Sequence, residues 1–301
     1  MSLSPEEFRE HLKLSSATAG LKLPDLTLPE AHHVILRGMR FHYLDWGTRG
    51  LPPALFLHGG GLNVHTWDLV CAALKPERHC LALDQRGHGD SDPAANGDYT
   101  VAAMAGDLAA FADTLGLARL SIVGLSMGGR VAIAFAGQHR ARVERLVVVD
   151  IGPDISEAGR MRVGTLLALA PELFTSLEEA IDFGRATSPR YTEAMLRHRV
   201  RHGTRPVPGG FAWKYDRALR DAVRSGTWRD PIDLWPLWRT IACPILLVRG
   251  ADSDVLSAET AKQMLAENRA ARLVEVAGAG HTVPGDQPAA FRALLDEFLA
   301  A

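Results

Sequence analysis

The chain of 301 residues has few cysteines and no long apolar run. Its three cysteines, Cys71, Cys80 and Cys243, are a sparse and odd-numbered set. They do not support a disulfide framework and are typical of the reducing cytoplasm, where we expect the protein. No stretch of about 18 consecutive apolar residues occurs, so no membrane span is expected. Residues 6–10 carry several charges and lack the apolar centre of a secretory signal.

The sequence also lacks a strong excess of either charge. Its formal net charge of −2 predicts neither a nucleic-acid partner nor an anionic membrane surface, and a small molecule is the expected partner. We find no metal-ligand cluster, and we expect His32, His33, His198 and His202 to lie at the surface. No cofactor is expected, and the oligomeric state is left open. At 47% hydrophobic residues, the chain can bury one large core and still carry an insertion.

The run Gly124-Leu125-Ser126-Met127-Gly128 is the most informative feature that is present. A strand-like segment, 120–123, precedes it, and a segment of small and apolar residues with helical character, 129–139, follows. Gly-x-Ser-x-Gly between a strand and a helix is typical of a nucleophile elbow, which projects the serine above the sheet. An ordinary glycine-rich turn is the alternative. The elbow reading makes Ser126 the candidate nucleophile.

A serine nucleophile needs a base, and His281 is the candidate. It follows the strand-like run 271–276 and the turn Ala277-Gly278-Ala279-Gly280. A glycine-rich turn beyond the last strand can bring an imidazole over the elbow. The other histidines lack this context.

An oxyanion hole is predicted from two backbone N–H groups. The run His58-Gly59-Gly60-Gly61 directly follows an apolar strand-like segment, 54–57. We assign the donors to Met127, after the nucleophile, and to Gly60, with Gly61 as the alternative to Gly60. A loose glycine loop is the competing interpretation of residues 58–61.

Further strand-like segments alternate with helical ones, which predicts an α/β protein with a mostly parallel sheet covered on both faces. The motifs above, with Asp84-Gln85-Arg86-Gly87-His88-Gly89-Asp90-Ser91, occur in the order typical of one superfamily. Over about residues 32–301 the chain resembles α/β-hydrolase-fold proteins. The resemblance implies an eight-stranded sheet and a structural role for Asp84 and Arg86, which would brace the loops under the pocket.

The acid that orients His281 is left open between two aspartates. The common layout of the superfamily places it in a Gly-x-x-Asp turn, but here that position is Ser253, flanked by Asp252 and Asp254. A branch of the superfamily instead places the acid after the strand that follows the nucleophile helix, which corresponds to Asp150. We favour Asp150 and keep Asp254 as the alternative. As structural alternatives, Asp150 would cap a loop and Asp254 would cap the helix predicted at 258–267.

The resemblance also implies two domains. Residues 1–153 and 239–301 would form the hydrolase core, with 1–30 as an N-terminal extension. Residues 154–238, too long for a loop, would form a helical cap over the pocket. Within it, Arg197, Arg201 and Trp213 are candidate substrate-binding residues, because an arginine can clamp a carboxylate. The alternatives are a solvated helix face for the arginines and a small cap core for the tryptophan.

These observations predict a serine hydrolase that uses an acyl-enzyme. Its substrate would be a carboxylic ester or a related small carbonyl compound with an amide or C–C bond to cleave. Serine rather than aspartate at position 126 argues against haloalkane dehalogenases and epoxide hydrolases. Two alternatives on the same fold stay open: a ligand receptor with little or no catalysis, and a cofactor-free peroxidase or oxygenase.

Overall fold

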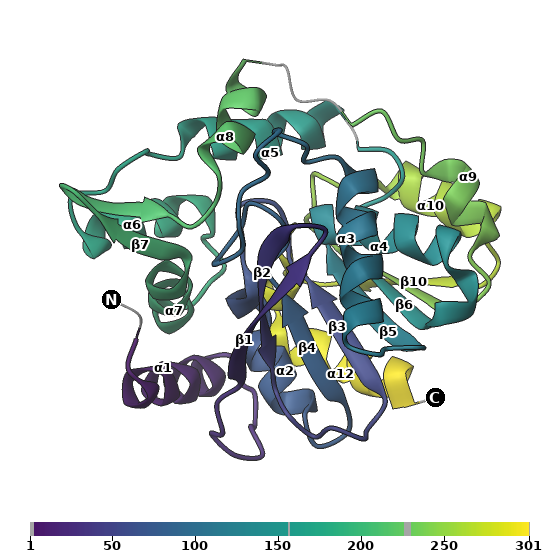
Figure 1. The fold of residues 1–301 in the computed structure, drawn as a ribbon, viewed down its shortest axis with the longest axis horizontal. Coiled ribbons are helices and arrows are strands. Elements are labelled where there is room, and N and C mark those ends of the chain that lie inside the picture. The colour runs from purple at the N-terminus through teal and green to yellow at the C-terminus, as the bar shows by residue number, and fades with distance from the viewer. Residues whose placement is uncertain (1–2, 156, 226–229, 301) are drawn as a thin grey trace.

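The computed structural model describes residues 3–155, 157–225 and 230–300. An eight-stranded sheet forms its centre, with the strand order β1-β2-β4-β3-β5-β6-β9-β10 (Figure 1). β2 runs antiparallel to both of its neighbours, and every other neighbouring pair is parallel. The predicted mostly parallel sheet is thereby confirmed. Its strands are β1 (Glu30–Leu36), β2 (Met39–Asp45), β3 (Pro53–Leu57), β4 (His79–Leu83), β5 (Leu120–Leu125), β6 (Val143–Val149), β9 (Ile245–Gly250) and β10 (Ala271–Val276).

Helices cover both faces of this sheet. Successive side chains of each central strand point to opposite sides, and because these side chains are apolar, both faces must be shielded from water. On β3, Leu55 and Leu57 enter one apolar core, whereas Ala54 and Phe56 enter the other. The first core is closed by α3 (Val101–Thr114), α4 (Met127–Gln138), α9 (Trp235–Thr240) and α10 (Ala258–Glu267). The second is closed by η1 (Val64–Trp67), α2 (Asp68–Leu74) and α12 (Pro288–Ala300). Two short helices, η2 (Arg140–Arg142) and α11 (Val283–Asp286), lie in connections.

The segment between β6 and α9 is built mainly of helices and lies at the left and top of the view in Figure 1, outside the sheet. Its helices are α5 (Glu157–Leu169), α6 (Leu177–Thr187), α7 (Glu193–Gly203) and α8 (Arg217–Arg224), and its hairpin strands are β7 (Thr204–Val207) and β8 (Gly210–Trp213). The hairpin was not expected, although Pro208-Gly209-Gly210 is a turn signal. A small apolar cluster around Phe174 and Ile181 joins α6, α7 and β8 within this segment. The predicted boundary at 238 falls inside α9, whose Trp238 packs into the core of the sheet.

The N-terminal extension contains a helix, α1 (Pro5–Thr18). Ser4 and Glu7 form a reciprocal capping box at its start, which satisfies two otherwise unpaired backbone N–H groups. Leu12 on this helix is fully buried. The extension therefore packs firmly on the rest of the chain.

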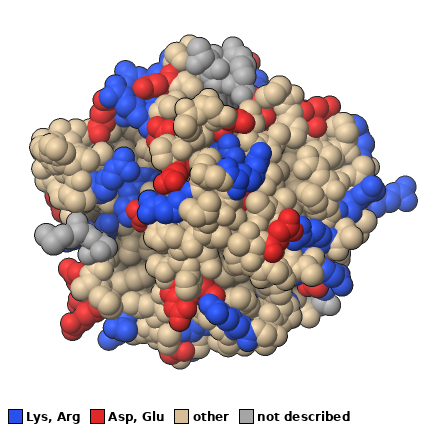
Figure 2. Space-filling model, viewed as in Figure 1, with Lys and Arg blue, Asp and Glu red and all other residues tan. Residues whose placement is uncertain are grey.

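Charged side chains of both signs are interspersed over the face shown in Figure 2, in keeping with the nearly balanced charge of the sequence. None of the helices in the described part of the chain is both long and apolar enough to cross a membrane. All three cysteines are free thiols.

Candidate active site

Ser126 stands on the sharp turn between β5 and α4. Its backbone has φ 52° and ψ −117°, a strained conformation for a residue with a side chain. The turn is possible because its flanking residues are glycines. A Cβ on Gly124 would lie 2.4 Å from the carbonyl oxygen of Gly128, and one on Gly128 would lie 2.3 Å from that of Leu57. The sequence therefore fixes a turn that presents the Ser126 hydroxyl above the sheet.

His281 lies on the turn after β10 and reaches Ser126 from the other end of the chain. Its Nε2 is 2.9 Å from Ser126 Oγ, and its Nδ1 is 2.8 Å from Asp150 Oδ2. Because a carboxylate only accepts hydrogen bonds, Nδ1 carries the ring proton and Nε2 is left to accept the serine O–H. Asp286 holds this turn, since its Oδ2 accepts the N–H of Gly280 at 2.8 Å.

Asp150 follows β6 and is fully buried, with φ 52°. Its carboxylate accepts three hydrogen bonds: from His281 Nδ1, from the backbone N–H of Gly250 at 3.0 Å, and from the Ser253 hydroxyl. Asp254 lines a cavity that Ser126 and His281 also line. The Nδ1 atom of His281, however, is hydrogen-bonded to Asp150. The structure thus brings Asp150, and not Asp254, to the imidazole.

The predicted oxyanion donors also lie beside Ser126. Met127 is the first residue of α4, so its N–H has no partner within the helix. A Cβ on Gly59 would lie 3.3 Å from Ser126 Cβ, which shows how closely the glycine run approaches the nucleophile. Gly60 and Gly61 both line the space around Ser126. The choice between them stays a prediction.

His58 positions the glycine run rather than facing the pocket. It is fully buried, its Nε2 accepts the N–H of Gln85 at 3.1 Å, and its Nδ1 is 2.8 Å from the Gly59 carbonyl oxygen. Burial lowers the pKa of His58, so the ring is neutral, with its proton on Nδ1. The imidazole therefore ties residues 58–59 to the loop after β4.

Asp84 and Arg86 hold the loop after β4 in place. Asp84 is buried and accepts hydrogen bonds from Val64 N at 2.8 Å and His42 Nδ1 at 2.7 Å. Burial acts to raise the pKa of Asp84, but its hydrogen bond and attraction to His42 outweigh this and lower it. Arg86 pairs with Asp107, with Nε 2.6 Å from Oδ2. Arg86 also donates to the carbonyl oxygens of Asp98, at 2.6 Å, and Ala103, at 3.4 Å, so both Asp84 and Arg86 hold backbone in place, as the resemblance implies.

Two cavities meet at Ser126. One, of about 200 Å³, is lined by His281 and by polar residues that include Arg190 and Arg199. The other, of about 260 Å³, is mainly apolar. Its lining includes Tyr99, Val101, Met127, Ile151, Ile155, Leu219 and Val255. Ser126, Gly60, Gly61 and Tyr215 line both.

Comparisons with known proteins agree with this arrangement. A profile of the alpha/beta hydrolase family matches residues 54–294. The chain belongs to this family. An esterase of Mycobacterium tuberculosis, Rv0045c, is 32% identical over 278 residues, which are 89% of this chain and 88% of that protein. A 3-hydroxybutyrate-oligomer hydrolase of Cupriavidus necator is 30% identical over 263 residues, or 83% of this chain and 89% of that one.

Solved structures give the same result. The crystal structure of an E-2-(acetamidomethylene)succinate hydrolase has a TM-score of 0.84 at 25% identity, covering 91% of this chain and 100% of that chain. The structure of Rv0045c has a TM-score of 0.80 at 29% identity, covering 100% of this chain and 99% of the other. With esterases and hydrolases as relatives over nearly its whole length, this chain is an alpha/beta hydrolase enzyme.

The structure does not bring the two predicted substrate-binding arginines to Ser126. Arg197 and Arg201 are exposed on α7 and line neither of these two cavities. Arg197 pairs with Glu178 at 3.0 Å and Glu193 at 2.8 Å, as the solvated-face alternative expected. Arg199, two residues along, points to the other side of the helix and lines the cavity. A helical period of 3.6 residues, applied to this arginine-rich helix, would have separated the two faces.

Trp213, the third candidate substrate-binding residue, lines the polar cavity. It also packs edge-on against Phe174, with ring centroids 5.3 Å apart, in the small apolar cluster of the inserted segment. Both interpretations of this tryptophan therefore describe part of its surroundings.

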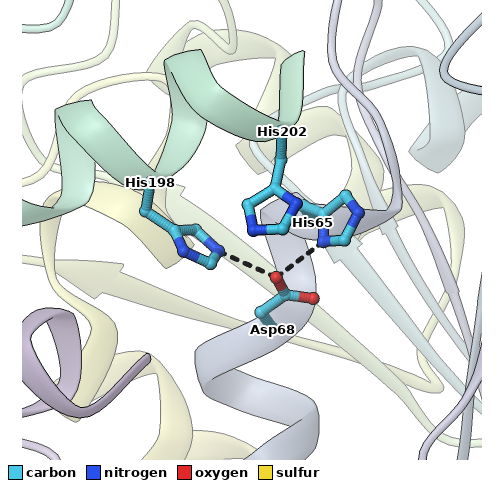
Figure 3. Close-up of side chains that lie close together, drawn as sticks. All are labelled: His65, Asp68, His198 and His202. Carbon is cyan, nitrogen blue, oxygen red and sulfur yellow. Dashed lines mark hydrogen bonds and ion pairs between the residues drawn. The ribbon is translucent and has the colours of Figure 1, made fainter. Parts of the chain in front are cut away.

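The expectation that His198 and His202 lie at the surface is wrong. Both residues belong to α7, and their side chains are buried. They lie with His65 and Asp68 in one cluster, whose potential ligand atoms are all within 4.8 Å of one another (Figure 3). The hydrolase thus contains a group of potential metal-ligating side chains, whereas none was expected. The signal was present as His198-x₃-His202 on a helix, a spacing that puts both rings on one face.

Proposed function

We propose that this enzyme is a serine hydrolase that cleaves carboxylic esters, or related small carbonyl compounds, through an acyl-enzyme. One observation carries the proposal: His281 lies between Ser126 Oγ, at 2.9 Å, and Asp150 Oδ2, at 2.8 Å. A nucleophile, a base and an orienting acid in hydrogen-bond reach of one another are what this chemistry requires. Esterase and hydrolase relatives support the same reaction class.

In the first half-reaction, Ser126 Oγ bonds to the substrate carbonyl carbon while His281 Nε2 takes the hydroxyl proton. The electron pair of the carbonyl moves to its oxygen, and the N–H groups of Met127 and Gly60 stabilise that charge at the positive end of α4. The tetrahedral intermediate then collapses. The bond to the leaving group breaks, and His281 Nε2 returns its proton to the departing atom.

The second half-reaction mirrors the first with water as the nucleophile. Water loses a proton to His281 Nε2 and attacks the acyl carbon. The bond to Ser126 Oγ breaks on collapse, the acid leaves, and the proton returns to the serine. Throughout, Asp150 keeps the imidazole oriented and stabilises its protonated form.

The two cavities support a substrate class. The apolar cavity suits a small hydrocarbon group, whereas Arg199 lines the polar one. Arg199 bonds to Ser188 Oγ at 2.6 Å and lies over the Tyr191 ring, and no carboxylate of the described residues pairs with it. A substrate carboxylate would supply the missing counter-charge. One structural relative is named for a substituted succinate, which itself carries carboxylates.

We propose that residues 154–238 act as the cap of this site. Phe183, Ser188, Arg199 and Trp213 all come from this segment and line the cavity that contains Ser126 and His281. A cap that supplies these contacts sets specificity and limits the access of water during the reaction.

A burst experiment with a p-nitrophenyl ester tests the acyl-enzyme directly. Acylation faster than deacylation releases one equivalent of nitrophenolate per chain before the steady state. We expect such a burst with short acyl groups, and none from Ser126→Ala. Steady turnover by Ser126→Ala at the wild-type rate would contradict the proposal.

A further inference from the structure

Four potential metal ligands meet between the inserted segment and the sheet domain. His198 and His202 lie one turn apart on α7, and His65 and Asp68 lie three residues apart across η1 and the start of α2. Figure 3 shows the two α7 rings directed toward the Asp68 carboxylate, with His65 beside His202. Asp68 Oδ2 is 2.8 Å from both His65 Nδ1 and His198 Nε2. Three imidazoles thus surround one carboxylate.

The cluster is shielded from water, and two of its polar atoms lack a hydrogen-bond partner among the described residues. Asp68 is fully buried, and His198 and His202 are nearly so. Phe8 of α1 covers the rings, with its centroid 4.6 Å from that of His202. Within the described part of the chain, His202 Nε2 and Asp68 Oδ1 have no hydrogen-bond partner. Burying such atoms without a partner is unfavourable, so the cluster has unused ligand capacity.

We propose that His65, Asp68, His198 and His202 form a binding site for a divalent transition metal of the Zn²⁺ type. Three nitrogens and one carboxylate oxygen match the ligand preferences of such ions, and the His-x₃-His pair on one helix face is a recognised spacing for them. This site is separate from the hydrolase reaction proposed above. It lies between the helix that supplies Arg199 and the start of α2, so a bound ion would pin the inserted segment to the sheet domain.

Binding requires a small rearrangement. Tetrahedral Zn²⁺ holds its donor atoms about 3.3 Å apart. The ligand atoms of this cluster lie up to 4.8 Å from one another, so some of them must move closer. His65 and His202 stack with ring centroids 3.7 Å apart and an interplanar angle of 27°. Since a metal lies in the plane of each imidazole that binds it, one of these rings turns about its Cβ–Cγ bond on binding. A small cavity lined by His65 and His198 gives the ion a route to the cluster.

The test is a Zn²⁺ titration of the metal-stripped full chain, followed by calorimetry. We expect one equivalent to bind and Tm to rise with Zn²⁺ and fall again with chelator. Replacement by Co²⁺ should give the intense visible bands of a tetrahedral site. In His198→Gln/His202→Gln, the dissociation constant should rise by at least about 100-fold. Unchanged affinity in this variant would overturn the proposal.

Two controls separate this site from others. His32→Gln/His33→Gln removes two imidazoles from β1 and should leave binding intact. His281→Gln removes the active-site imidazole and should also leave it intact; loss of binding there would move the metal to the active site and overturn the proposal. Weak octahedral Co²⁺ bands in the wild-type chain would overturn it without any variant, even if the double variant fails to fold.

Discussion

The hydroxyl of Ser253 donates a hydrogen bond to Asp150 Oδ2, the same oxygen that faces His281 Nδ1. Asp150 comes from the end of β6, whereas Ser253 comes from the turn after β9, the neighbouring strand. In the common layout of the superfamily, the acid occupies the position of Ser253. Here a serine at that position supports a carboxylate that enters from the next strand. The two layouts therefore place an acid near the same point from different strands.

The first prediction concerns Ser253. Ser253→Ala removes one of three hydrogen bonds to a buried carboxylate, and a bond to a charged group contributes about 1.5–3 kcal/mol. We expect kcat to fall by about tenfold with little change in KM, because Asp150 then orients His281 less well. Ser257→Ala is the matched control, since that serine caps α10 in the same loop. Equal effects of the two substitutions on kcat would count against the role of Ser253.

A second prediction compares the two candidate acids. Asp150→Asn should lower kcat on the order of 10⁴-fold, because the amide favours the wrong imidazole tautomer. Asp254→Asn should lower it far less, since Nδ1 is bonded to Asp150. Steady-state kinetics on one ester decide between them. The reverse ranking would return the acid to the turn after β9.

A third prediction moves the acid. In Asp150→Asn/Ser253→Asp, the carboxylate enters from the position used in the common layout, and the amide at 150 can donate to it. We expect kcat to recover at least about tenfold relative to Asp150→Asn alone, a gain of about 1.4 kcal/mol in transition-state stabilisation. No recovery, in a variant shown to be folded by circular dichroism, would mean that the two positions are not interchangeable around His281.

A fourth prediction concerns the substrate. Arg199→Gln should raise KM for an ester that carries a terminal carboxylate and leave KM for the neutral ester of equal length unchanged. Arg197→Gln is the control, because Arg197 lies on the same helix but pairs with Glu178 and Glu193. A similar rise in KM for both esters with Arg199→Gln would argue against a carboxylate clamp.

The sheet and the positions of Ser126 and His281 were predictable because each depends on local signals. Apolar runs mark the strands, and glycines at 124 and 128 are required by backbone contacts below 2.5 Å. Gly278 and Gly280 likewise mark the turn before His281. These features depend on residues close in sequence, so the sequence displays them.

The remaining features depend on contacts between distant segments. Asp150 and Asp254 could not be separated, because the choice depends on which carboxylate the β6 and β9 ends bring to His281. Arg197 and Arg199 differ only in which face of α7 meets the sheet domain. The burial of His198 and His202 depends on Asp68, which lies 130 positions from His198. Such pairings are set by tertiary packing.

The central claim is that Ser126 is the nucleophile activated by His281. It is tested most directly by treating the enzyme with a fluorophosphonate, digesting it, and locating the adduct by tandem mass spectrometry. We expect one phosphonyl group per chain, attached to Ser126 Oγ, and a sharply slower reaction in His281→Gln, while Ser126→Ala stays unlabelled. Removal of a serine in such a site costs about 10⁶ in kcat, so ester turnover should disappear with the label. An adduct on another residue, or full labelling and turnover in Ser126→Ala, would contradict the account.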